Sequence, residues 1–185
     1  MAGRREMILE ASAELFFERG FAATGVDEIG AAVGVTGPAF YRHFASKHDL
    51  LVALVERAVT RLQEVVDRAV AAADGDPERA LRLLAEFSAE ACVDDGPLTA
   101  LYTQEARNLQ PDARARLNGM QRKMRKVWID VLRQLRPELS DAELMLAIHA
   151  VGALQTSVAT YHGTLDEASQ RDLLTRLTLA ALHWT

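Results

Sequence analysis

Apolar residues recur every three or four positions along most of the chain, the spacing that places them on one face of an α-helix. Near the start, Ile8, Ala11 and Leu15 follow this spacing, and Gly20 supplies a C-terminal stop. The sequence shows neither the strict alternation that indicates a strand nor a hairpin turn pair. The pattern therefore predicts an all-α fold of about nine helices.

Turn and capping residues divide this pattern into helices. Short helices are expected over 26–33 and 37–44. Later helix starts are marked by a capping residue or by an early proline, at Ser46, Asp76, Gly96, Pro111, Ser140 and Thr164. Ser140 and Thr164 each begin an S/T-x-x-E capping box. The chain is thus expected to end in two helices joined by a turn at Gly163.

Composition and charge narrow the class of protein. The 185 residues, 49% hydrophobic and 25% charged, fit a globular chain rather than a disordered one. The single cysteine, Cys92, cannot form an internal disulfide, which suits a reducing cytoplasm. Acidic residues outnumber basic ones, 26 to 21. If the chain contacts DNA, it must therefore do so through a local site and not through a general positive charge.

Two short helices joined by a glycine turn are the pattern of a helix-turn-helix. Gly30 falls where the two helices cross in contact, and Gly34 falls where the turn needs a positive φ. Apolar residues stand where the pair must rest on a third helix, at Ile29, Val33, Val35 and Phe40. Spacing alone also allows an ordinary pair of short helices in a bundle.

The second helix of this pair is suited to face a DNA duplex. Its opening residues allow the backbone to approach phosphates or base edges closely and are Thr36, Gly37, Pro38 and Ala39. Hydrogen-bond donors follow in a stretch without an acidic residue, at Tyr41, Arg42, His43, Lys47 and His48. Taken one by one, these residues also fit a solvated helix face.

The run VTGPAFYRHFASKHDL from Val35 to Leu50, with RGFAATGVDEIGAAVGV before it, resembles the DNA-binding domain of the TetR family of transcriptional regulators. The resemblance covers roughly the first fifty residues. It departs from the family pattern at Gly25, where Ser or Thr usually caps the helix, and at Gly30, where alanine is commoner. It implies a helix-turn-helix domain over 1–47 and a ligand-binding and dimerisation domain over 48–185.

The resemblance also implies which residues meet the DNA. The expected contacts are Thr36, Gly37, Pro38, Ala39, Tyr41, Arg42, His43 and Lys47. Tyr41 and Lys47 are expected mainly on phosphates, which set the register. Pro38 and Ala39, with Arg42 or His43, are expected nearer the bases. A homodimer would present two such segments to a pseudo-palindromic operator with half-sites about one helical turn apart. Release by a small hydrophobic or amphipathic effector, and repression as the outcome, are expected from the family.

The effector site is expected among residues on the helices that usually line it in the family: Phe87, Leu101, Tyr102, Arg107, Met124, Trp128 and Gln155. The segment 112–136 carries eight basic residues against two acidic ones. Two interpretations stay open for it. It is either a solvated helix face or the entrance for an anionic effector such as an acyl coenzyme A thioester, whose phosphates guanidinium groups bind.

The last two predicted helices carry apolar stripes that suit a dimer interface. The expected interface residues are Ile148, Val151, Gly152, Leu173, Leu177, Ala181 and Trp184. The alternative is that both are core helices of a monomer. The stretch from Leu144 to Leu165 lacks charged residues, but its second half is polar, which predicts a buried helix and no membrane span.

Other functional classes find little support in the sequence. It contains no HExxH, GxSxG or phosphate-loop motif and no Cys/His metal spacing, so neither an enzyme nor a metal or other cofactor is expected. The remaining rival is a helical carrier or sensor of hydrophobic ligands without a DNA role. The donors between Thr36 and Lys47 argue against it. A cytoplasmic, DNA-binding regulator is the prediction.

Overall fold

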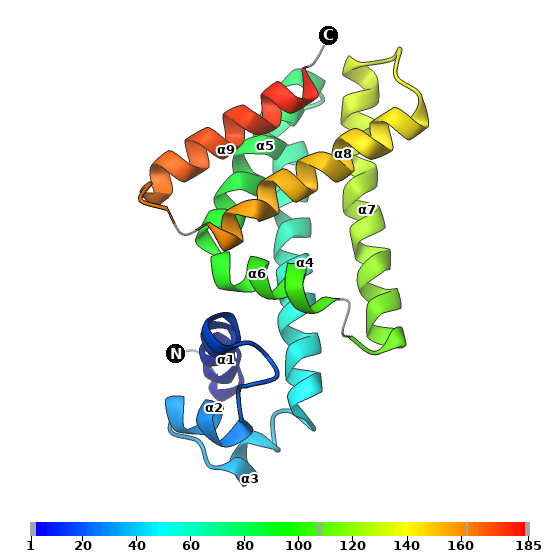
Figure 1. The fold of residues 1–185 in the computed structure, drawn as a ribbon. Helices are drawn as coiled ribbons and strands as arrows, with labels where there is room; N and C mark the ends of the chain where they lie inside the picture. The colour runs from blue at the N-terminus through cyan, green and yellow to red at the C-terminus, as the bar shows by residue number, and fades with distance from the viewer. Residues whose placement is uncertain (1–2, 107–108, 162, 184–185) are drawn as a thin grey trace. The chain divides into compact units, whose positions relative to one another are not determined.

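The structure, a computed structural model, describes residues 3–106, 109–161 and 163–183 (Figure 1). The described residues form nine α-helices and one short 3-10 helix, and no strand occurs among them. In chain order these are α1 (Arg4–Arg19), α2 (Val26–Ala32), α3 (Gly37–Phe40), α4 (Lys47–Ala73), α5 (Pro77–Asp94), α6 (Gly96–Glu105), α7 (Pro111–Leu135), α8 (Asp141–Thr156), η2 (Ser157–Thr160) and α9 (Glu167–Leu182). The all-α prediction is confirmed.

Several helix ends follow the predicted capping chemistry. Gly20 ends α1 with φ of 82°, and its N–H donates to the Phe16 carbonyl. The Asp76 carboxylate accepts from two backbone N–H groups at the start of α5, those of Glu78 and Arg79. Ser140 opens α8 with the predicted capping box. The Asp76 and Ser140 side chains and the Gly20 N–H satisfy backbone groups that a helix end leaves without a partner.

Two helix boundaries differ from the prediction by more than one residue. The second short helix ends at Phe40 and not at residue 44. Residues 41–43 form a turn, in which the His43 N–H donates to the Phe40 carbonyl at a spacing of three residues. The last helix begins at Glu167 with Asp166 as its N-cap. The capping box predicted at Thr164 is therefore wrong. The carboxylate of Asp166 stands in the cap position itself and accepts from the Ser169 N–H at 2.9 Å.

The chain divides into two compact units. The first comprises residues 1–58 and 97–116, and the second comprises 59–96 and 117–185. Because α4 and α7 each cross from one unit to the other, the division does not coincide with a single point in the sequence. The boundary between 47 and 48 stays a prediction.

The first unit holds the two short helices (Figure 1). Its apolar centre is built from fully buried side chains of α1, α2, α3 and α4, among them Ile8, Phe16, Ile29, Phe40 and Leu50. Ile29 and Phe40 are buried as the spacing predicts, whereas Val33 and Val35 are half-buried. The recognition segment is thus fixed to the unit from its apolar side.

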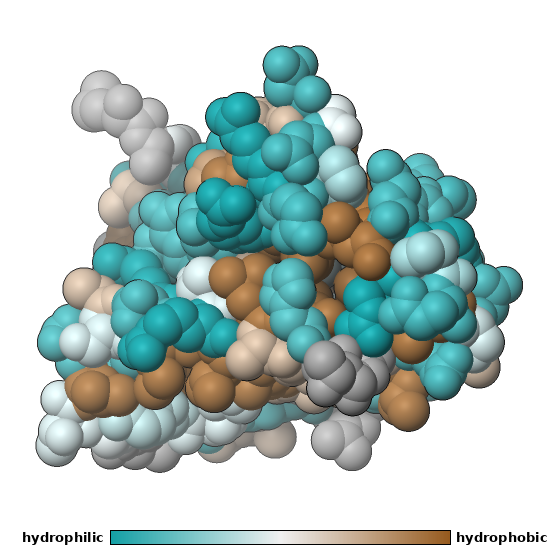
Figure 2. Space-filling view, turned by 90° about the horizontal axis from the view of Figure 1, so that it is seen from above, coloured by the Kyte–Doolittle hydropathy of each residue, from teal (hydrophilic) through white to brown (hydrophobic). Residues whose placement is uncertain are grey.

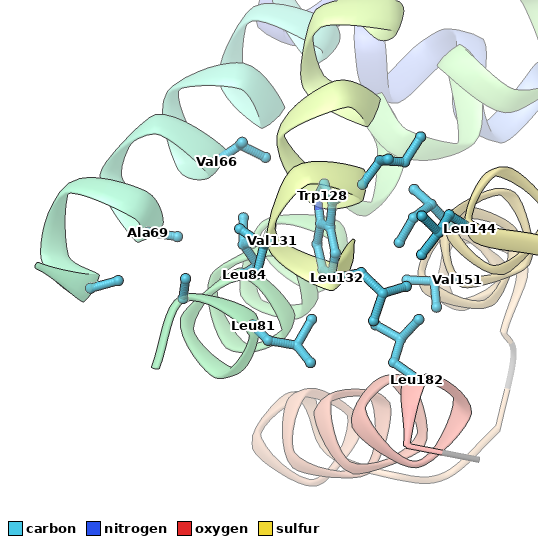
Figure 3. Packing of buried hydrophobic residues seen from close by; sticks show 14 residues of the cluster. Val66, Ala69, Leu81, Leu84, Trp128, Val131, Leu132, Leu144, Val151 and Leu182 are labelled. Carbon is cyan, nitrogen blue, oxygen red and sulfur yellow. The ribbon is translucent and has the colours of Figure 1, made fainter. Parts of the chain in front are cut away.

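The second unit is a helical bundle around one apolar core (Figure 3). Figure 3 shows side chains of five helices meeting there, with Val66 and Ala69 from α4, Leu81 and Leu84 from α5, Trp128, Val131 and Leu132 from α7, Leu144 and Val151 from α8, and Leu182 from α9. All of these residues are buried. The core holds α8 and α9 against α5, so the far sides of these two helices remain available at the surface of the subunit.

Candidate DNA-binding site and effector domain

The crossing of α2 and α3 leaves room only for glycine at position 30. A Cβ built on Gly30 would lie 2.4 Å from the backbone carbonyl oxygen of Val35, closer than real Cβ contacts come. The Val35 N–H closes the same turn by donating to the Gly30 carbonyl at 2.8 Å. Gly34 has φ of 65°, in the left-handed region that favours glycine. The steric demands predicted for both glycines are confirmed, and the contact at Gly30 explains the absence of the commoner alanine.

The start of α2 is capped from one side. The Glu28 carboxylate accepts from the Gly25 N–H at 3.4 Å. Gly25 has no side chain that could accept from the Glu28 N–H in return, so only half of a capping box exists. Glu28 also forms an ion pair with Arg19, the last residue of α1. This carboxylate therefore links the end of α1 to the start of α2.

The opening of α3 presents little side-chain bulk to its surroundings. Thr36 occupies the N-cap position without a side-chain capping bond. Thr36 and Pro38 are exposed, and Gly37 and Ala39 are half-buried. The Asp27 carboxylate lies 3.2 Å from the position of a Cβ on Gly37, so α2 packs closely against this opening. The backbone of the recognition segment is thus exposed on one side and supported on the other.

Polar donors follow directly after α3. The Tyr41 side chain is 56% exposed, and its ring packs edge-on against Phe40 with the centroids 5.4 Å apart. Arg42 is exposed and, within the described part of the chain, forms no ion pair. His43 is half-buried. Tyr41 and Arg42 therefore have the exposure that contact with a duplex requires, and the predicted residues from Thr36 to His43 form one continuous segment.

Lys47 differs from the other predicted DNA contacts. It is the first residue of α4 and is half-buried. Its ammonium group donates to the backbone carbonyls of Phe21 at 2.7 Å and Thr24 at 2.8 Å. The same nitrogen lies 4.5 Å from the centre of the Phe21 ring. Its contacts within the subunit thus run to the turn between α1 and α2.

Two arginines outside the predicted set also contact the helix-turn-helix. The guanidinium of Arg4 donates to the Val33 carbonyl at 3.3 Å, and that of Arg5 lies 4.8 Å from the centre of the Phe44 ring. They place positive charge beside the turn and the recognition segment. In the sequence, Arg4 and Arg5 can be recognised as a basic pair at the very start of the first helix.

The residues predicted for the effector pocket fall into two groups. Phe87, Met124, Trp128 and Gln155 belong to the second unit, Leu101 and Tyr102 belong to the first, and Arg107 lies outside the described residues. Trp128 is 5% exposed and is part of the hydrophobic core, and Phe87 and Met124 pack against that core. An aromatic residue at helical spacing does not by itself distinguish a pocket wall from a core position.

Gln155 carries a polar group without a partner. The residue is 6% exposed, and its Nε2 atom has no hydrogen-bond partner among the described residues. The hydroxyl of Thr178, on α9, is also buried without a hydrogen-bond partner among the described residues. A buried donor that is not satisfied by protein costs free energy, so such groups are commonly satisfied by water or by a ligand. Gln155 is the predicted residue with the most evident capacity to bind a polar atom.

Phe87 also lines a hollow on the surface of the second unit. The hollow has a volume of about 190 Å³ and lies between α4 and α5. Most of its charged side chains pair within the subunit: Arg68 lies 3.8 Å from Glu90 and over the Phe87 ring, and Asp94 pairs with Arg171. The hollow therefore offers few unpaired charges to a ligand.

The basic stretch along 112–136 is partly neutralised. Arg116 pairs with Glu56, Lys126 and Arg133 pair with Asp130, and Arg136 pairs with Glu138. Among the described residues three cations on about one turn of α7 form no ion pair, Arg122, Lys123 and Arg125. The excess charge predicted for this segment is thus concentrated on one short part of α7, within the second unit.

Comparison with known proteins identifies the family. Residues 8–54 match "Bacterial regulatory proteins, tetR family", and residues 74–162 match "Tetracyclin repressor-like, C-terminal domain". The transcriptional repressor KstR2 of Mycobacterium tuberculosis is 31% identical over 153 residues, covering 77% of this chain and 74% of the relative. The chain belongs to the TetR family. It is therefore a DNA-binding transcriptional regulator.

Solved structures agree with this membership. A structure of the ketosteroid transcriptional regulator KstR2 of M. tuberculosis superposes with a TM-score of 0.83 at 27% identity, covering 98% of this chain and 94% of that one. AibR in complex with isovaleryl coenzyme A and operator DNA shares the fold, with a TM-score of 0.78 at 20% identity over 95% of this chain and 97% of that one. The TetR fold thus extends over nearly the whole chain.

In this TetR-family chain the residues predicted for the dimer interface divide between core and surface. Ile148 and Val151 are 6% and 2% exposed and belong to the core of their own subunit, so they cannot supply an outer face. Gly152, Leu173, Leu177 and Ala181 are exposed, and Trp184 lies outside the described residues. The exposed large apolar residues of α8 are Met145 and Leu146, which are not among the predicted interface residues.

These side chains form what we call the α8–α9 face: Met145, Leu146, Gly152, Leu173, Leu177 and Ala181. Leu146 is 67% exposed and Leu177 is 45% exposed. Seen from above, the surface carries hydrophobic side chains along one edge (Figure 2). Residues Asp141–Thr160 are long and apolar enough to cross a membrane by length and composition, with 28% of the segment buried. A helix covered by a partner subunit has the same composition.

Proposed function

We propose that this chain is a repressor that binds a pseudo-palindromic operator as a homodimer and leaves it when a small amphipathic effector binds. The observation that carries the proposal is the recognition segment. Its small opening residues and the exposed Tyr41 and Arg42 follow a turn whose geometry is fixed at Gly30 and Gly34. Repression is the role that the name of the relative KstR2 states for that protein. A site of action in the cytoplasm, where bacterial DNA lies, belongs to the same proposal.

The α8–α9 face supports the homodimer. An exposed apolar face of this kind is costly in water and is commonly covered in an assembly. A two-fold contact between two such faces would join four helices, two from each subunit. Such a dimer would present two recognition segments to successive major grooves on one side of the duplex.

An acyl coenzyme A thioester is the effector class that we propose to test first. Arg122, Lys123 and Arg125 are unpaired within the described part of the chain and could bind its phosphates. The free amide of Gln155 could donate to a thioester carbonyl. The TetR fold holds such a ligand in the AibR complex. The steroid chemistry named for KstR2 is the alternative to be compared with it.

Binding to DNA that flanks the gene tests the first part of the proposal. Fluorescence anisotropy should show specific binding by the wild type. Arg42→Ala should weaken it by about tenfold or more, because loss of one good contact to a base edge costs about 1–3 kcal/mol. Lys123→Ala, which removes a cation from the second unit, is the matched control and should have little effect. Equal affinity of the wild type for operator and unrelated DNA would contradict the proposal.

Thermal shift measurements test the effector class. A thioester at one hundred times its Kd should stabilise the protein by about 2.7 kcal/mol, which is about 5–10 °C for a domain of this size. Replacing Arg122, Lys123 and Arg125 by alanine should reduce the shift given by acyl coenzyme A and leave that given by an uncharged ligand. Stabilisation by steroids alone would favour the alternative.

A further inference from the structure

The side chain of Lys47 connects α4 to the turn between α1 and α2. Its ammonium donates to two backbone carbonyls of that turn, those of Phe21 and Thr24, at 2.7 and 2.8 Å. Short charge-assisted hydrogen bonds of this kind are among the stronger ones in proteins. The nitrogen also faces the Phe21 ring at 4.5 Å, within the range of a cation–π contact. One ammonium group thus makes three contacts within its own subunit.

The turn that Lys47 holds is itself joined to α1 and α4. Thr24 is 1% exposed, and its hydroxyl donates to the Gly20 carbonyl at 3.0 Å. The Phe21 ring packs edge-on against Phe16 on α1 and against His48 on α4, with centroid distances of 5.2 and 5.1 Å. Since α2 begins at Val26, directly after this turn, any movement of the turn would tilt α2 and the recognition segment that follows it.

We propose that Lys47 is a positioning residue for DNA binding, which acts by fixing the α1–α2 turn to the first residue of α4. This inference rests on the proposed DNA-binding role of the segment 36–43. It differs from the sequence-based expectation that Lys47 mainly contacts a phosphate. Two of the three ammonium protons are already directed to carbonyl oxygens, and the group is half-buried. Arg42, by contrast, is exposed and unpaired among the described residues.

The composition of the chain allows a direct test on the wild type. It contains three lysines, Lys47, Lys123 and Lys126. Lys123 has no ion pair within the described part of the chain, and Lys126 pairs with Asp130. Reductive methylation of the DNA-free protein, followed by peptide mass spectrometry, reports the reactivity of each amine. Lys123 is the free reference, and Lys126 is the reference for an amine in an exposed ion pair.

Lys47 should be methylated about tenfold more slowly than Lys123, the factor that corresponds to breaking one hydrogen bond to a charged group. Its rate should also lie below that of Lys126. Adding operator DNA should change the rate at Lys47 little, because the amine is engaged beforehand. A Lys47 rate equal to that of Lys123 without DNA, with protection appearing only on adding operator, would overturn the proposal in favour of a phosphate contact.

A substitution series separates positioning from phosphate contact. Lys47→Met should lower operator affinity about tenfold and speed amide exchange over residues 21–25 in the DNA-free protein. Its effect on the salt dependence of operator binding should not exceed that of Lys126→Met, which removes the same charge elsewhere. A slope lowered by about one per subunit relative to Lys126→Met, with unchanged amide exchange, would overturn positioning.

The methylation experiment and the substitution series together distinguish failure of this inference from failure of the proposed function. If Lys47→Met does not fold, the methylation rates of the wild type still decide the question. If the wild type binds no operator, the proposed function fails, and the rates in DNA-free protein still report whether the α1–α2 turn holds Lys47. Slow methylation together with an unchanged affinity of Lys47→Met would show that the contact exists without positioning the DNA-binding segment, which overturns the inference.

Discussion

The two compact units of this protein are stabilised in different ways. In the first unit, short helices are joined by turns in which individual backbone atoms meet, as at Gly30 and Val35, and polar side chains such as Lys47 close the turns. In the second unit, long helices pack around a core of mainly aliphatic side chains. The second unit also carries buried polar atoms without partners and an exposed apolar face. Among the described residues, the buried polar atoms without partners therefore lie in the second unit, where the proposed effector and the proposed partner subunit would bind.

The largest effect expected from this difference concerns the α8–α9 face. Leu146→Glu should dissociate the proposed dimer, because burial of a leucine is worth about 1.5–3 kcal/mol and two-fold symmetry counts each substitution twice. The dimer dissociation constant should rise by about 10² to 10⁴. Sedimentation equilibrium measures it.

The control for this substitution is Val70→Glu, at an apolar residue of α4 that is 39% exposed and lies outside the α8–α9 face. It should leave the dimer intact. Dissociation by Val70→Glu but not by Leu146→Glu would place the interface elsewhere. The exposed apolar residues of the α8–α9 face would then not distinguish the second unit from the first.

The next effect contrasts the same substitution in the two units. Gly30→Ala should lower the free energy of unfolding by about 1–3 kcal/mol, because the new methyl group would overlap the Val35 carbonyl oxygen. Gly119→Ala, in α7, should raise it by up to about 1 kcal/mol, because the added Cβ meets only the end of the Arg122 side chain and alanine favours the helix. Urea denaturation measures both.

The two variants should also differ in operator affinity. Gly30→Ala should bind the operator more weakly even at a temperature where it is fully folded, because α2 must move away from α3. Gly119→Ala should bind as the wild type does. Equal stability of the two variants would show that the turn adapts to a methyl group and is less constrained than the structure indicates.

A third prediction concerns the buried amide of Gln155. In the absence of effector, Gln155→Met should leave the free energy of unfolding unchanged or raise it by up to about 1–3 kcal/mol. Methionine has a shape similar to that of glutamine and lacks the unsatisfied donor. Thr178→Val should act in the same direction for the same reason. Thermal denaturation of ligand-free protein measures the change. A large loss of stability in both variants would show that these polar groups are satisfied within the subunit.

The constraints of the first unit explain why the sequence predicts it well. A glycine at the crossing and another in the turn are needed for specific steric reasons, so their spacing identifies the motif. The direction of the Lys47 side chain could not be predicted. A flexible lysine at the start of a helix reaches a phosphate or a neighbouring carbonyl with equal ease, and only the folded turn brings the carbonyls of Phe21 and Thr24 to it.

The second unit offered the sequence fewer constraints. Because α8 is apolar on most sides, periodicity does not tell which of its stripes faces the core. Ile148 and Val151 therefore entered the predicted interface, although they are buried, and Leu146 did not, although it is exposed. Trp128, on α7, is predicted for the pocket but belongs to the core, because an aromatic residue at helical spacing fits either position. Exposure in three dimensions supplies the information that hydropathy lacks.

The smallest expected effect concerns the start of α9, where two acceptors lie two residues apart. Asp166→Ala should lower the melting temperature slightly, because the Ser169 N–H loses its acceptor. Thr164→Ala should have no effect.

The hydrogen bond to Ser169 lowers the pKa of the Asp166 carboxyl below its ordinary 3.8, so the folded state favours the ionised form. Its stabilisation is therefore fully present above that ordinary value and is lost as the pH falls through the lowered pKa. The difference between wild type and Asp166→Ala should accordingly shrink on acidification, and a difference that persisted below this pKa would show that the cap does not depend on the charge.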